Sequence, residues 1–150
     1  MGKRPQGKAP LTYKVPDGWR NAPDPSGITV ALFTVSEGRE TALLKITPLN
    51  GSLPGGLTEN VNRWRRDDVK LPALSPAEVE KLTFPTMQVA GIEAKTLDLQ
   101  GPTLRSLVVW FERGGTTWFF KFIGPTKLVG GQKSKFEEFM KSVQFPGGAE

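Results

Sequence analysis

The side chains with the clearest chemical potential lie in one run, from Asn60 to Asp67, which spells Asn-Val-Asn-Arg-Trp-Arg-Arg-Asp. Its guanidinium groups can bind carboxylate or phosphate oxygens through paired hydrogen bonds, and its tryptophan can anchor a partner. The run holds no nucleophile beside a base. Its chemistry is therefore binding, and the candidate binding residues are Asn60, Asn62, Arg63, Trp64, Arg65 and Arg66.

The element that positions these side chains is a predicted helix, which begins after the breaker Pro54-Gly55-Gly56. Leu57, Val61 and Trp64 follow at i, i+4 and i+7, the spacing of one helical face. Glu59 in the first turn of this helix and the arginines in its last turn match the helix macrodipole. Asparagine is unfavourable inside a helix, so two asparagines close together indicate partners outside it.

Two interpretations of this helix are open. In the first, its apolar face docks on the core and the asparagines tie it to a neighbouring loop, which makes the run a structural clasp. In the second, Trp64 is half exposed, and Arg63, Arg65 and Arg66 hold an anionic ligand or partner.

An enzyme would have to use carboxylates here, for example Asp67 with Asp68, or Glu59. Such a site requires two carboxyl groups that converge in a cleft and have raised pKa values. The chain has no histidine and no cysteine, which excludes thiolate chemistry, histidine-based acid–base catalysis and most zinc or iron sites. We predict no enzymatic activity, no cofactor and no metal site.

The composition is that of an ordinary globular domain. The 150 residues are enough for one domain with a sizeable core, and the net charge of +5 is modest for a nucleic-acid binder. No run reaches the roughly 18 apolar residues that cross a bilayer, and the start does not resemble a signal peptide. We expect residues 1–10 to be a disordered tail or a segment added for expression, residues 11–146 to form a single domain, and residues 147–150 to be a second tail.

Seven segments have the alternation or β-branched composition of strands, and we expect a sheet of about six strands. Pro85 marks its segment as an edge strand or a bulge. The strand-like segments are 11–15, 28–35, 41–47, 82–89, 92–99, 103–113 and 116–123.

Two further helices are predicted. Ser75-Pro76-Ala77-Glu78 is a strong helix start and opens a short helix to about Lys81. A last helix runs from Gly131 to about Val143 with an apolar stripe and a charged opposite side.

The clearest hairpin turns at Gly114-Gly115. Both faces of its two arms carry bulky side chains, so we expect cover on both sides of the sheet. Its aromatic arm, 118–122, lacks the glycine pattern of an RNA-binding sheet, and we predict no nucleic-acid partner. The order of elements predicts an α+β domain, an antiparallel sheet flanked by helices.

Three features together resemble a known family. They are the asparagine–arginine–tryptophan run, Gly91 ahead of a strand, and the segment 118–125 followed by Phe136-Glu137-Glu138-Phe139. Across residues 11–146 the chain resembles the uncharacterised lipoproteins of planctomycete and verrucomicrobial bacteria, which share the fold of PsbP, the extrinsic photosystem II subunit, and of the yeast Ran-binding import factor.

The resemblance implies a PsbP-like α/β/α sandwich and an extracytoplasmic, periplasmic or lipid-anchored location in the bacterial cell envelope. It implies a non-enzymatic module that docks on another protein, with any lipid anchor outside this chain. The alternative function is binding of a small anionic ligand or polymer by Arg63, Arg65, Arg66 and the loop from Leu49 to Gly56. A concave pocket at those residues with salt-sensitive binding would distinguish it.

Overall fold

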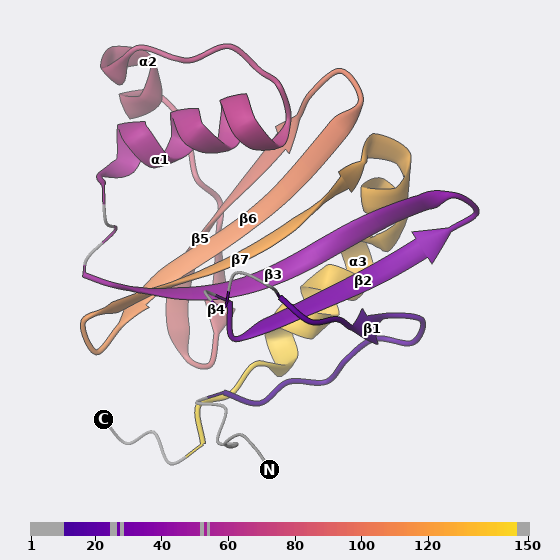
Figure 1. Cartoon of the computed structure of the whole chain (residues 1–150). Coiled ribbons are helices and arrows are strands. Elements are labelled where there is room, and N and C mark those ends of the chain that lie inside the picture. The colour runs from indigo at the N-terminus through magenta and orange to yellow at the C-terminus, as the bar shows by residue number, and fades with distance from the viewer. Residues whose placement is uncertain (1–10, 25–26, 28, 52, 54, 147–150) are drawn as a thin grey trace.

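The computed structural model describes residues 11–24, 27, 29–51, 53 and 55–146. These residues form one antiparallel sheet with helices against both faces (Figure 1). The α+β fold class predicted from the sequence is confirmed. The two predicted tails lie outside the described residues.

The sheet has seven strands in the order β1-β2-β3-β7-β6-β5-β4, and every pairing is antiparallel. The strands are β1 (Arg20–Asn21), β2 (Ala31–Glu37), β3 (Glu40–Asn50), β4 (Thr86–Val89), β5 (Ile92–Gln100), β6 (Leu104–Arg113) and β7 (Thr116–Pro125).

The seven strands agree with the expected sheet of about six, but the first predicted strand was wrong. Residues 11–15 contribute only an isolated bridge between Thr12 and Gln144, and the short β1 takes the edge position beside β2. The segment 82–89 forms a strand only after Pro85, as β4, at the other edge. Pro85 was correctly placed at an edge because proline cannot donate to a ladder.

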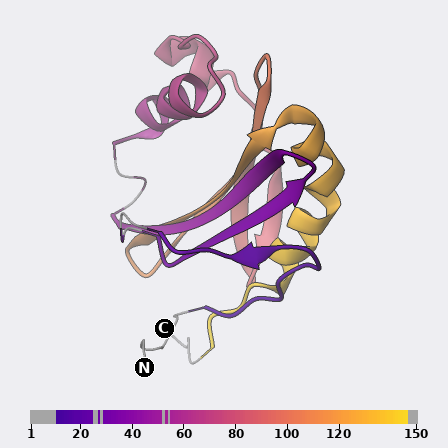
Figure 2. The ribbon, with the colours of Figure 1, turned by 45° about the vertical axis from the view of Figure 1, so that its right-hand side comes forward.

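The helices form two layers, one on each side of the sheet (Figure 2). α1 (Leu57–Arg63), the π-helical turn η1 (Trp64–Asp68) and α2 (Pro76–Glu80) cover one face, and α3 (Thr126–Ser142) covers the other. α2 carries the predicted capping box: Ser75 Oγ accepts from the Glu78 N–H, and Glu78 accepts from the Ser75 N–H. α3 begins five residues before the predicted Gly131, because Leu128 and Val129 are buried in the core.

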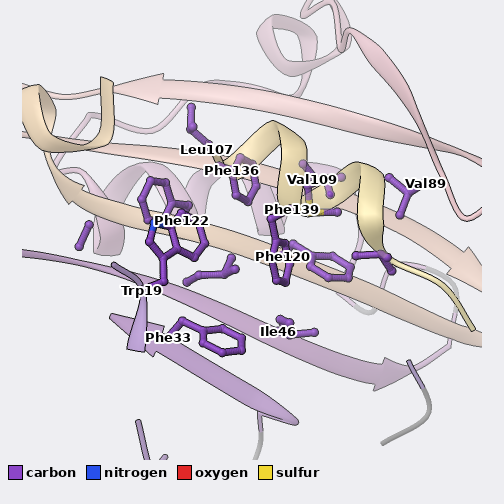
Figure 3. Packing of buried hydrophobic residues seen from close by; sticks show 14 of the residues in the cluster. Trp19, Phe33, Ile46, Val89, Leu107, Val109, Phe120, Phe122, Phe136 and Phe139 are labelled. Atoms are coloured by element: carbon purple, nitrogen blue, oxygen red, sulfur yellow. The ribbon is translucent and has the colours of Figure 1, made fainter. Parts of the chain in front are cut away.

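The larger part of the core lies between the sheet and α3 (Figure 3). Phe122 stacks on Phe136 of α3 with ring centroids 5.6 Å apart, and Trp19 stacks on Phe122 at 5.1 Å. The Trp19 indole N–H donates to Gln132 Oε1 at 2.9 Å. Trp19 is thus a buried core residue.

The second part of the core lies under α1, η1 and α2. Trp64 packs on Trp110 and Phe119 with centroids 5.3 and 6.0 Å apart. β6 and β7 therefore bury side chains on both faces, as the bulk on both sides of the hairpin predicted.

Gly124 of β7 lies tightly against Ala42 of the neighbouring strand β3. A Cβ atom there would be 2.6 Å from Ala42 Cβ. We expect Gly124→Ala to lower the free energy of unfolding by about 1–3 kcal/mol, because overpacking forces the backbone to shift. Urea unfolding measures this change.

The matched control is Gly131→Ala in α3, where an added Cβ meets nothing within 4 Å. It should leave stability unchanged or raise it by up to about 1 kcal/mol, since alanine favours a helix. Equal loss in both variants would contradict the close-approach explanation.

Candidate functional site

The helix of the Asn60–Arg66 run presents its apolar face to the sheet. Val61 is fully buried and Trp64 is 1% exposed. Of the two interpretations of this helix, the second, with Trp64 half exposed, was wrong on this point, because the indole packs on Trp110 and Phe119. Trp64 is therefore a core residue of the α1 layer.

The two asparagines and Arg65 tie this helix to backbone. Asn62 Oδ1 accepts from the Leu74 N–H at 2.8 Å, and Asn62 Nδ2 donates to the Leu74 carbonyl at 2.9 Å. Arg65 Nε donates to the Pro72 carbonyl at 2.7 Å. Asn60 Nδ2 donates to the Gly56 carbonyl at 2.7 Å. The Asn62 and Arg65 contacts form a clasp that joins α1 and η1 to the loop before α2, whereas Asn60 bonds to Gly56 at the start of its own helix.

The remaining arginines of the run have partners within it. Arg63 donates to Asn60 Oδ1 at 2.6 Å, and Arg66 Nε donates to Asp67 Oδ1 at 2.8 Å. This hydrogen bond lowers the pKa of the Asp67 carboxyl and raises the pKa of Arg66. A catalytic carboxyl would need a raised pKa, so Asp67 has the opposite of the required shift.

Asp68 points to the sheet. η1 places its carboxylate 2.9 Å from Lys121 Nζ of β7, and both side chains are largely buried. This ion pair attaches η1 to β7, because removing either charge would leave the other largely buried and unpaired. Asp67 and Asp68 each therefore have a cation of their own.

The loop before α1 approaches the end of the β6–β7 hairpin. Thr117 Oγ1 accepts from the Leu53 N–H at 2.8 Å and donates to the Gly51 carbonyl at 2.6 Å. Ser52 and Pro54 lie outside the described residues. Of the six candidate residues, Arg63 and Arg66 are exposed, and a binding role for the run stays a prediction.

The clasp makes a direct prediction. We expect Asn62→Ala to lower the free energy of unfolding by about 1–3 kcal/mol, since the Leu74 N–H and carbonyl would lose a part-buried partner. Arg66→Ala should change it by less than about 0.5 kcal/mol, because this side chain is exposed. Paired urea titrations measure both, and equal effects would exclude the clasp.

A groove of about 660 Å³ lies on the other face of the sheet. One wall is α3, with Lys133, Glu137 and Lys141, and the other is the segment from Thr83 to Met87. The floor is apolar and consists of Leu107, Val109 and Phe136, together with Thr96 of β5. An apolar floor with few polar groups at its rim is typical of a binding site.

The charged side chains beside this groove differ in how closely they are paired. Asp98 accepts two hydrogen bonds from Arg105, at 2.9 and 2.6 Å, and these bonds raise the pKa of the Arg105 guanidinium. Lys133 Nζ is 3.9 Å from the same carboxylate. Asp98 is thus neutralised, and Lys141 adds a second lysine to the rim. The local balance is three cations against Asp98 and Glu137.

The sequence did not predict this groove, although two of its signals were present. Pro85 was expected to mark an edge strand or a bulge, and it directly precedes β4, the edge strand beside the groove. Lys133, Glu137 and Lys141 follow at intervals of four and so share one side of α3. That side was predicted only as the charged side of the helix. The place where β4 stops pairing with β5 lies beside it through contacts between distant segments, which no local pattern shows.

The described residues contain no group of three or more histidine, cysteine, aspartate or glutamate side chains that could hold a metal ion. In the same part of the chain no helix has the length and apolarity needed to cross a bilayer.

Comparison with known proteins identifies the fold. No protein-family model matches the chain, and no curated protein sequence matches it. The solved structures that resemble it include a protein from Bacteroides thetaiotaomicron, at 14% identity and a TM-score of 0.55 over 94% of this chain. This chain covers 47% of that protein, so it spans about half of its length.

Two further structures are similar. LpqN, described as involved in cell envelope biogenesis of Mycobacterium tuberculosis, is 13% identical with a TM-score of 0.49, over 89% of this chain and 82% of that one. Cyanobacterial PsbP (CyanoP) from Synechocystis is 14% identical with a TM-score of 0.54, over 93% of this chain and 95% of that one. Identities this low establish fold alone, and the fold of this chain is PsbP-like.

Proposed function

We propose that this protein is a non-enzymatic protein-binding module of the bacterial cell envelope, and that it docks on its partner through the groove beside α3. The observation that carries the proposal is the groove itself. Its volume is about 660 Å³, its floor is apolar, and it is open to solvent between α3 and the segment from Thr83 to Met87. A concave apolar surface with a few polar groups at its rim is the usual form of a binding site.

Several observations support a binding role over catalysis. The chain lacks histidine and cysteine, and its adjacent aspartates are each held by a cation. Of the two acids at the groove, Asp98 is held by two hydrogen bonds from Arg105. The groove therefore offers contact surface and charge, which serve recognition.

The envelope location rests on the sequence resemblance to the planctomycete and verrucomicrobial lipoproteins, carried by the Asn60–Arg66 run and the segment 118–125. Membership in that family, a lipid anchor outside this chain and an extracytoplasmic location belong to the proposal. The PsbP-like fold is compatible with these proposals, but it does not establish them, because fold alone does not determine function.

The anionic-ligand alternative draws less support from the same geometry. Arg63 and Arg65 donate to Asn60 and to the Pro72 carbonyl, and Arg66 pairs with Asp67. A guanidinium already engaged by protein acceptors gains less from an anion. The clasp thus uses the donors that an anion would need.

Site-specific cross-linking tests the proposal. The photoreactive residue p-benzoylphenylalanine replaces Thr86, which is exposed and lines the groove, or Thr41, which is exposed at the far end of the sheet. In envelope extracts of the source organism, we expect Thr86 to capture a discrete protein and Thr41 to capture none. Mass spectrometry then locates the cross-link.

Charge variants supply the control. Lys133→Gln with Lys141→Gln removes both lysines of the rim, and should reduce capture at Thr86 by roughly tenfold for a lost binding energy near 1.4 kcal/mol. Lys127→Gln with Arg39→Gln changes the net charge equally at exposed sites away from the groove and should have no effect. Equal capture at both photoprobe positions, or equal effects of both pairs, would exclude docking through the groove.

A further inference from the structure

The outer side of β5 loses its neighbour partway along. β4 pairs with β5 from Ile92 to Lys95, and the last contact is the Thr96 N–H, which donates to the Pro85 carbonyl at 2.8 Å. Proline has no N–H, so Pro85 cannot donate a hydrogen bond back to β5. Phe84 turns to the other face and packs on Trp110, with centroids 5.4 Å apart. Within the described residues, nothing pairs with β5 on this side beyond Thr96.

The backbone groups left at this edge can be assigned by alternation. In an antiparallel strand, successive residues point their N–H and C=O groups to opposite sides. Thr96 points outward, and the Gly101 N–H points inward to the Leu104 carbonyl at 2.8 Å. Asp98 and Gln100 therefore point outward; both are exposed, and the described part of the chain gives neither an outward backbone partner.

Unpaired N–H and C=O groups beside an apolar groove are what strand addition requires. We propose that the groove takes an extended, proline-free segment of the partner, which adds to β5 along Asp98–Gln100 and pairs with its free backbone groups. This inference rests on the proposed protein-binding function and names the form in which the partner is recognised.

The side-chain preferences of that segment follow from the geometry. A residue opposite Asp98 shares its face of the sheet, which carries Leu107 and is covered by Phe136 of α3. Every second residue of the segment should therefore be apolar. Because Asp98 is neutralised by Arg105 while Lys133 and Lys141 line the rim, a carboxylate in the segment complements the groove.

The test uses a random octapeptide library displayed on phage, selected against the full chain. We expect enriched peptides with alternating apolar residues, at least one acidic residue and no proline in the core positions. Each enriched peptide is then synthesised with single N-methyl groups along its backbone. Methylation should weaken binding by roughly tenfold or more at alternate amides and have little effect at the amides between them, because only every second N–H faces β5.

A change in the protein tests the same edge. Gln100→Pro removes one outward N–H and leaves the β5–β6 ladder intact, so it should also weaken binding by roughly tenfold. Gln88→Pro is the matched control, because by the same alternation Gln88 points its N–H away from β5 on the outer side of β4. Thermal unfolding of both variants confirms that they are folded.

Three outcomes overturn the inference. They are a library that yields no groove-dependent peptide, N-methyl effects without a period of two, and a dimer of this chain in sedimentation that is lost in Gln100→Pro, which would make a second copy the occupant. If cross-linking at Thr86 still captures a partner, the protein-binding function stands and only strand addition fails. If both fail, the groove has no docking role.

Discussion

The structure depends on one constraint: the β6–β7 hairpin carries large apolar side chains on both of its faces. Phe120 and Phe122 face α3, and Trp110 and Phe119 face the α1 layer. A hairpin of this kind cannot lie at an edge or leave either face in water without exposing a large apolar surface. It occupies the middle of the sheet, and each helical layer buries one of its faces. The clasp and the Lys121–Asp68 pair then fix where the α1 layer sits.

Local chemistry made much of this fold predictable. The capping box at Ser75, the glycine turn at Gly114 and the helical spacing of Leu57, Val61 and Trp64 each depend on residues close together in the chain. The start of α3 was missed because Pro125, Gly130 and Gly131 disfavour a helix, and burial of the first turn outweighs that preference. The π-helical turn η1 was also missed, since it serves contacts with β7 that no local pattern encodes.

The candidate sites were likewise predictable only where they depend on residues close together in the chain. The sequence showed which residue types of the Asn60–Arg66 run could bind, but the partners they have belong to Pro72, Leu74 and the core aromatic rings. An asparagine with two backbone partners and one that binds a ligand look identical in sequence. The groove was harder still, because its walls and floor come from α3, the approach to β4 and two strands. Only the tertiary arrangement brings these segments together.

The strand order has a consequence for how the chain folds. β1 to β3 form one meander and β4 to β7 another, and the β2–β3, β4–β5 and β6–β7 connections are two-residue turns. A single seam joins them, where β3 meets β7 and Asn50 pairs with Thr116. Closing this seam carries the largest loop-closure entropy in the sheet, since the helices α1 and α2 and a whole meander lie within the loop. We therefore expect two meanders that form early and a seam that sets the folding rate, with the α1 layer docking as the seam closes.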